Sequence, residues 1–194
     1  QDLTRAGYFI ATGGGPGIME AASMGAFLAE VSDEDLEGAL ATLSHAPVYT
    51  DEGYMQCVQE VLDMFRHGRS SLAVPTWFYG HEPSNLFSVH IAKYFSNSLR
   101  EDGLLAIALH GIIFAPGSAG TTQEVFQDAT QNHYATYGVV SPMVFIGREH
   151  YGENTLIYDC LSRQAESKGY EDYLCLTESE EEVAAFIASH PPGE

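Results

Sequence analysis

Short apolar runs alternate with longer stretches of helical periodicity along most of this chain. The runs are rich in β-branched and aromatic side chains and fall at residues 7–11, 71–75, 111–115, 143–146 and 173–176. Short strands of mainly apolar residues, separated by helices, are typical of a parallel sheet that helices cover on both faces. We therefore expect an α/β fold of the doubly wound, Rossmann-like kind.

The segments between these runs predict the helices. We expect them at residues 18–30, near 85–108, 121–133 and 150–167, and near 179–189. A chain of 194 residues is about the size of one domain, so residues 1–194 are expected to form a single Rossmann-like domain.

Residues 31–70 interrupt this rhythm. Ser32-Asp33-Glu34-Asp35 is typical of a helix start, and Asp51-Glu52 precedes a second amphipathic stretch. We interpret the region as an α-helical insert between two strands, in part a lid over a site, although the acidic run itself is more simply a solvated surface. Residues 1–7 resemble the last turn of a helix and its C-cap, so we expect that an N-terminal β–α unit is missing.

The net charge argues against one class of partner. The chain has 8 Lys and Arg against 27 Asp and Glu, a formal net charge of −19. Such a chain repels nucleic acid, because the affinity of a protein for nucleic acid depends on Lys and Arg displacing counterions from the phosphates. A small phosphate ester is compatible with this charge, since backbone dipoles and one or two local arginines are enough to hold it.

Cysteine usage and hydropathy indicate the compartment. Cys57, Cys160 and Cys175 are scattered, with no C-x-x-C pair, as expected in a reducing compartment. No run reaches the roughly 20 apolar residues of a membrane span, and no charged-then-apolar leader opens the sequence. We therefore expect a cytoplasmic protein with no membrane partner. The eight histidines show no metal-ligand spacing, and we predict neither a metal nor a cofactor.

Two glycine-rich turns carry the candidate chemistry. Thr12-Gly13-Gly14-Gly15-Pro16-Gly17 and Pro116-Gly117-Ser118-Ala119-Gly120-Thr121 each follow an apolar run and open a predicted helix. Free backbone N–H groups at two helix N-termini favour a nucleotide-sized anion.

In the first turn the candidate phosphate-binding residues are Gly14, Gly15 and Gly17. The turn lacks the sixth-place glycine of the dinucleotide fingerprint, and no Walker-type Gly-Lys follows it. The alternative is a tight strand-to-helix turn selected for packing alone.

The second turn leaves two interpretations open. In one, Thr121 is the N-cap of the next helix and Glu124 completes a capping box. In the other, the turn is a phosphate cradle, and Glu124 projects from the helix's first turn towards a sugar, where the dipole keeps it ionised. The candidate phosphate-binding residues are Gly117, Ser118, Ala119, Gly120, Thr121 and Thr122.

Both motifs resemble those of the LOG (Lonely Guy) family. The strings are GGGPGIMEA at residues 13–21 and PGSAGTTQE at residues 116–124, and the family's second motif reads P-G-G-x-G-T-x-x-E. The resemblance runs from about residue 7 to 146. It implies a cytokinin riboside 5′-monophosphate phosphoribohydrolase acting on AMP or an N6-modified adenine nucleotide. It also implies a homodimer with sites near the subunit interface.

One position departs from the family motif, because Ser118 stands where the family has a glycine. A positive φ at this site would strain serine by about 1 kcal/mol or more. Alternatively, the Ser118 hydroxyl donates to the phosphate. We interpret Ser118 as the mark of a subfamily.

The family also uses an arginine on the helix ahead of the second motif's strand. Arg100 precedes that motif by nearly the family spacing, so the resemblance gives the catalytic roles to Arg100 and Glu124. The alternative for Arg100 is an exposed ion pair with Glu101 or Asp102, which would be worth little.

Two further features have a functional and a structural interpretation. The polar stripe around Asp128 on the helix of Glu124 lines either a ribose and base pocket or the solvent face. The aromatic cluster at residues 74–83 ends a strand and either stacks on a purine or caps the core.

These features predict hydrolysis of the N-glycosidic bond of a nucleoside 5′-monophosphate to free base and ribose 5-phosphate. Glu124 would engage the ribose and activate water, and Arg100 would position that carboxylate. The competing hypothesis is a non-catalytic carrier of a nucleotide or phosphorylated cofactor with the same fold. A pure carrier needs no carboxylate at the glycosidic carbon. A third hypothesis, decarboxylation of an amino acid, is set aside because the sequence offers no suitable lysine to form a Schiff base.

Overall fold

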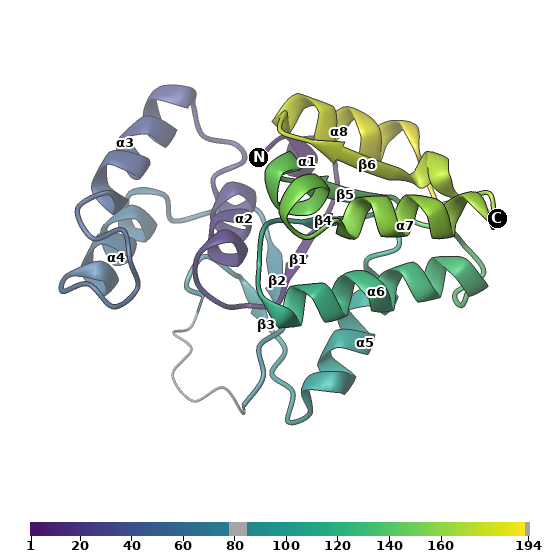
Figure 1. Cartoon of the computed structure of the whole chain (residues 1–194). Helices are drawn as coiled ribbons and strands as arrows, with labels where there is room; N and C mark the ends of the chain where they lie inside the picture. Colours follow the sequence, from purple (N-terminus) through teal and green to yellow (C-terminus); the bar gives the residue numbers. More distant parts are fainter. Residues whose placement is uncertain (78–84, 193–194) are drawn as a thin grey trace. The chain divides into compact units, whose positions relative to one another are not determined.

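The computed structural model describes residues 1–77 and 85–192 as a mixed α/β protein (Figure 1). Within these residues the strands form two three-stranded parallel sheets flanked by helices, with the orders β1-β2-β3 and β4-β5-β6. This confirms the α/β class and the parallel pairing. The chain divides into two compact units, Gln1–Arg100 and Glu101–Glu194. The doubly wound order and the single domain stay predictions.

The sheet of the first unit consists of β1 (Ile10–Thr12), β2 (Ser71–Ala73) and β3 (His90–Ile91). Strand β2 is central, and its register pairs Ser71 with Ile10 of β1. Helix α2 (Ile18–Phe27) follows the first glycine turn and packs on β1 and β2. It begins where the sequence predicts and ends three residues earlier, at Phe27 instead of residue 30.

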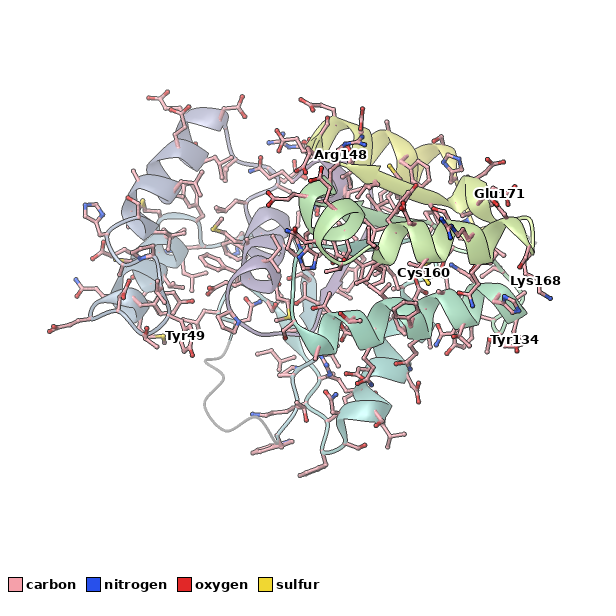
Figure 2. The ribbon with its side chains drawn as sticks, in the orientation of Figure 1. Tyr49, Tyr134, Arg148, Cys160, Lys168 and Glu171 are labelled. Atoms are coloured by element: carbon pink, nitrogen blue, oxygen red, sulfur yellow. The ribbon has the colours of Figure 1, made fainter. Side chains whose placement is uncertain are left out.

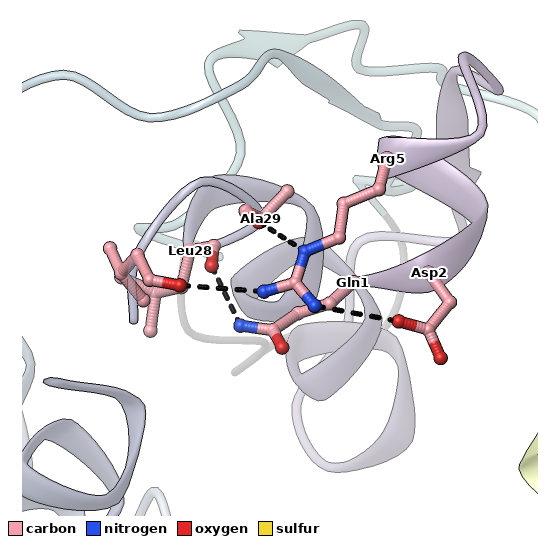
Figure 3. Close-up of polar contacts among 6 residues, drawn as sticks. Gln1, Asp2, Arg5, Leu28 and Ala29 are labelled. Carbon is pink, nitrogen blue, oxygen red and sulfur yellow. Dashed lines mark hydrogen bonds and ion pairs between the residues drawn. The ribbon is translucent and has the colours of Figure 1, made fainter. Parts of the chain in front are cut away.

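The chain opens with the short helix α1 (Asp2–Arg5), as the sequence of residues 1–7 predicts. Arg5 Nε donates to the carbonyl of Ala29 at 2.6 Å, and Gln1 Nε2 donates to that of Leu28 at 2.7 Å (Figure 3). These bonds satisfy carbonyls just past the end of α2, where the helix itself supplies no partner. Helix α1 is therefore tied to the C-terminal end of α2.

The predicted helical excursion consists of α3 (Asp33–Leu43) and α4 (Tyr54–Met64). Ser32 caps α3, because its hydroxyl accepts a hydrogen bond from the Asp35 amide at 3.1 Å. The apolar faces of α3 and α4 pack with α2 around their own cluster of buried side chains, which includes Leu28, Ala39, Val58, Val61 and Phe87.

The second unit holds β4 (Ile112–Phe114), β5 (Met143–Ile146) and β6 (Leu174–Thr177), with β5 central. The boundary between the units falls inside α5 (Asn97–Ile107). The remaining helical elements are α6 (Ala119–Tyr134), the π-helix η1 (Glu149–Asn154), α7 (Ile157–Glu166), the 3₁₀ turn η2 (Glu171–Tyr173) and α8 (Glu180–Ser189). Buried Val125, Phe145, Tyr151 and Leu161 belong to one core cluster within this unit.

Two of the predicted helices are wrong in extent. The stretch near 85–108 is helical only from Asn97, because the backbone of residues 90–94 pairs with β2 and the residues that follow it. For example, the Ala92 amide donates to the Ala73 carbonyl and the Tyr94 amide to that of Pro75. The stretch at 150–167 is broken at Leu156, whose φ of +54° separates η1 from α7. Within the described residues, no helix is long and apolar enough to cross a membrane.

Candidate functional site

The first glycine turn leaves β1 at Thr12 and is packed closely against the chain after β2. Gly14 has φ +78°, and a Cβ there would lie 2.9 Å from Pro75 Cδ and 3.2 Å from Ala73 Cβ. Its amide donates to Thr12 Oγ1 at 3.2 Å. Both the backbone conformation and the lack of space require glycine here, so packing alone accounts for Gly14.

Gly13 is different, because a charged side chain occupies the space beside it. A Cβ at Gly13 would lie 2.7 Å from Arg100 Nη1 and 2.9 Å from Met19 Sδ. Arg100 comes from the start of α5 and belongs to the same unit as the turn. The structure therefore brings the predicted arginine against the first glycine turn.

The turn ends at Gly17, the N-cap of α2, which has φ +75°. Glycine has no side chain to cap a helix, unlike Ser32 at the start of α3. The first amides of α2 are therefore left for a ligand or for water. Gly15 lies under the Met19 side chain, since a Cβ there would meet Met19 Cε at 2.6 Å.

The second glycine turn follows β4, and its helix starts earlier than the capping-box interpretation requires. Ser118 is the N-cap of α6 and Ala119 the first helical residue, so Thr121 lies inside the helix. The interpretation of Thr121 and Glu124 as a capping box is therefore wrong. For the same reason Glu124 lies in the second turn of α6, not the first, and its side chain is half-buried.

Ser118 is not strained. Its φ of −101° and ψ of −157° are extended, so serine fits here as well as glycine would. Gly117 is constrained instead, because a Cβ there would lie 2.1 Å from Thr121 Oγ1. The first turn of α6 has no acidic residue, whereas the first turns of α3 and α8 each have three. The positive end of the α6 dipole is therefore not neutralised by its own sequence.

Sequence reasoning missed Arg148, a basic residue at the same edge of this sheet. Gly147 follows β5 with φ +112°, and a Cβ there would lie 3.0 Å from Pro116 Cγ of the second turn. Arg148 comes next and is exposed (Figure 2). Its amide donates to Glu178 Oε1 at 2.6 Å. The sequence signal that could have identified Arg148 is the pair Gly147-Arg148 directly after the apolar run at residues 143–146.

Helix α6 is joined to the C-terminal part of α5 by two side-chain hydrogen bonds. Gln123 Nε2 donates to Glu101 Oε2 at 2.5 Å, and Gln127 Nε2 donates to Asp102 Oδ1. Glu101 is only 1% exposed, so it is not the surface acid that the ion-pair alternative for Arg100 assumed. The Glu101–Gln123 bond fixes the residue that precedes Glu124.

The polar stripe of α6 is not a solvent face at Asp128. Asp128 is 2% exposed, and burial raises the pKa of its carboxyl to about 7. One turn further, Asn132 is also buried; its Nδ2 donates to the Ser141 carbonyl and its Oδ1 accepts from the Ser141 amide. This part of the stripe holds the second unit together instead of lining an exposed surface.

The predicted site residues thus lie in two groups. Gly14, Gly15, Gly17 and Arg100 lie together in the first unit, and residues 117–122 lie with Glu124 in the second. The meeting of the two turns, and of Arg100 with Glu124, stays a prediction. Of the aromatic cluster, residues 78–83 lie outside the described residues; Trp77 is exposed and stacks on Phe95 with ring centroids 5.7 Å apart.

Comparison of the chain with protein-family models and with curated proteins finds no match.

Proposed function

We propose that this chain hydrolyses the N-glycosidic bond of a nucleoside 5′-monophosphate, releasing the free base and ribose 5-phosphate. The substrate class is AMP or an N6-modified adenine nucleotide. The reaction needs no cofactor: water attacks C1′, the bond from C1′ to the base nitrogen breaks, and the base leaves with a proton.

The observation that carries the proposal is the position of Arg100 against Gly13. The chain has only 8 Lys and Arg among 35 formally charged residues, 8 basic and 27 acidic. Any residue larger than glycine at position 13 would displace this guanidinium. A guanidinium placed in this way favours an anionic ligand at the turn. An arginine without a functional role would not need the space that glycine leaves at position 13.

The start of α6 supports a phosphate at the second turn. Its first amides, from Ala119 to Thr121, lie beyond an N-cap that makes no side-chain hydrogen bond to the helix, and no acid lies in the first turn. Unneutralised N–H groups at the positive end of a helix are a common phosphate site. In this proposal the amides of residues 117–121 would hold the 5′-phosphate; the Thr122 amide is not available, because it donates to the Ser118 carbonyl at 3.1 Å.

Glu124 would act on the sugar. It lies one helical turn beyond the proposed phosphate amides and is half-buried. In the reaction C1′ acquires oxocarbenium character, which a carboxylate stabilises most strongly where water is partly excluded. The Glu101–Gln123 hydrogen bond would hold this part of α6 in place.

The test is whether the full chain releases adenine from AMP, with the adenine measured by chromatography. Glu124→Gln should lower kcat by about 100-fold or more, the usual contribution of a positioned acid or base. Glu166→Gln, an exposed acid on α7, is the matched control and should leave kcat unchanged. Full turnover in Glu124→Gln would remove its assigned role. AMP binding without adenine release in the unmodified chain would instead support the carrier hypothesis.

We also propose a homodimer. Trp77 and Phe95 are 56% and 71% exposed although they are large, stacked aromatic residues, and Lys93 Nζ lies 4.2 Å from the centre of the Trp77 ring. Exposed apolar groups gathered in this way are typical of protein interfaces. Light scattering after size-exclusion chromatography tests this, and Phe95→Asp should shift a dimer towards monomer.

A further inference from the structure

A cavity of about 540 Å³ lies in the first unit between the start of α2 and the helical excursion. Its walls come from Pro16 and Gly17 of the first turn, from α2, from the α3–α4 connection that includes Tyr49 (Figure 2), and from α4. All the lining residues belong to one compact unit. The volume falls within the range of pockets that hold small organic ligands.

The walls of this cavity are mostly apolar. Met24, Leu40, Val58 and Phe87 contribute hydrocarbon and aromatic surface from separate elements. Val48 and Tyr49, which also line it, remain 49% and 43% exposed, so the cavity is not filled by its own side chains. An occupant with an apolar body would remove this surface from water.

A hydrogen-bonded polar pair, Glu20 and Tyr54, lies in this mostly apolar lining. Tyr54 donates a short hydrogen bond from its hydroxyl to Glu20 Oε1. Burial, and then the neighbouring Glu20, raise the pKa of Tyr54, so the phenol keeps its proton and stays a donor in this hydrogen bond. Glu20 and Tyr54 come from α2 and α4, so the pair joins the two walls.

The charge of Glu20 is only partly offset by the protein around it, through its place in the first turn of α2 and the hydrogen bond from Tyr54. None of the cavity-lining residues is basic, and among the described residues Glu20 has no ion-pair partner. The chain as a whole has a formal net charge of −19, which raises the local concentration of small cations. A cationic head therefore complements the carboxylate, and an apolar body complements the walls.

We propose that this cavity is a binding site for a small amphipathic amine. The ammonium group hydrogen-bonds to the Glu20 carboxylate, and an aromatic or aliphatic body packs against α3 and α4. This site is distinct from the glycosidic-bond chemistry proposed above and does not depend on it. It adjoins the first glycine turn through Pro16 and Gly17.

The probes are 4-phenylbutylamine and its uncharged counterpart 4-phenylbutan-1-ol, titrated into the full chain by calorimetry near neutral pH. The amine should bind at one site with Kd of about 1 mM or tighter, as expected for a fragment of this size. The alcohol should bind about tenfold more weakly, because it lacks the charge-assisted hydrogen bond. Absence of saturable amine binding, or equal affinity for both probes, would overturn the proposal.

Matched variants locate the binding. Glu20→Gln should reduce the amine affinity to that of the alcohol, while Glu37→Gln, an exposed acid on α3 outside the cavity, should not. Ala21→Phe fills the cavity from α2 and should abolish binding of both probes. Ala22, the next residue, is also exposed but does not line the cavity, so Ala22→Phe should bind both probes normally.

A second blocking variant guards against a fold defect in the first. Val48→Trp fills the cavity from the α3–α4 connection and should also abolish binding. Thermal unfolding of each variant identifies any that fail to fold. Amine binding that survives in folded Ala21→Phe or Val48→Trp, or a preference for the amine that survives in Glu20→Gln, would show that the amine binds elsewhere.

Discussion

The adjacent glycines Gly13 and Gly14 allow stability and function to be separated by one substitution each. Gly14 has φ +78°, and a Cβ there would lie 3.1 Å from the backbone nitrogen of Pro75 and 2.9 Å from its Cδ. Left-handed backbone costs a residue with a side chain about 1–2 kcal/mol. Overpacking against a rigid ring adds about 1–3 kcal/mol.

For Gly14→Ala we therefore expect a loss of about 3 kcal/mol in the free energy of unfolding. In a chain of this size such a loss lowers Tm by about 6–12 °C. Gly13→Ala should behave differently, because its φ is not in the left-handed region and its new Cβ would meet only the ends of the Arg100 and Met19 side chains. These can move, so the stability should change by less than about 1 kcal/mol.

The same movement should damage function. If Arg100 acts as proposed, shifting its guanidinium by about 1 Å should lower kcat/KM for AMP by about 100-fold. The assay is adenine release, combined with thermal unfolding of both variants. Gly38→Ala is the control, because nothing lies within 4 Å of a Cβ at this position in α3, and alanine should stabilise the helix by about 0.5–1 kcal/mol.

Two results would refute this reasoning. Gly13→Ala with unchanged kcat/KM would show that the contact with Arg100 is incidental. A loss of Tm in Gly13→Ala as large as that in Gly14→Ala would show that the side chains beside Gly13 cannot move aside.

Three further predictions concern stability. Burial raises the pKa of Asp128 above its value in the unfolded chain, so the folded state binds an extra proton and the free energy of unfolding should fall as pH rises from about 4 to 7. Asp128→Asn should remove this pH dependence, measured by urea unfolding at pH 5 and pH 8. An equal pH dependence in the variant would contradict the prediction. Asn132→Ala should cost about 2–4 kcal/mol, because it leaves the buried Ser141 amide and carbonyl without their side-chain partner; a loss below about 1 kcal/mol would show that water replaces it. Arg5→Ala should cost about 1–2 kcal/mol through the bond to Ala29, and hydrogen exchange should show faster opening of α1; unchanged protection would contradict this.

Local sequence pattern predicted the elements that have a strong local signal. The apolar runs before both glycine turns correspond to β1 and β4, and the acidic starts of α3 and α8 carry the serine caps that their sequences favour. Strand β3 was missed because His90 and Ile91 are both exposed, so no buried apolar run marks a strand only two residues long. Its conformation is set by pairing with β2, a contact distant in sequence.

The site shows the same division. The position of each glycine turn between a strand and a helix was predictable from local sequence, whereas the functional roles of the turns and of Arg100 stay predictions. The Thr121–Glu124 pattern was misleading, because the extended backbone of Ser118 starts α6 before Thr121. The Glu20–Tyr54 bond joins residues 34 apart, and the burial of Asp128 depends on packing around α6, so neither has a local signal.

The separate apolar cluster of α3 and α4 has an evolutionary consequence. These helices rest on α2 mainly through hydrocarbon contacts, which are not directional and tolerate exchange of one apolar residue for another. Mutations in this layer can therefore reshape the neighbouring cavity while the backbone of the glycine turns keeps its geometry. Divergence in small-molecule preference would accumulate first in residues 36–65, ahead of any change in the sheet.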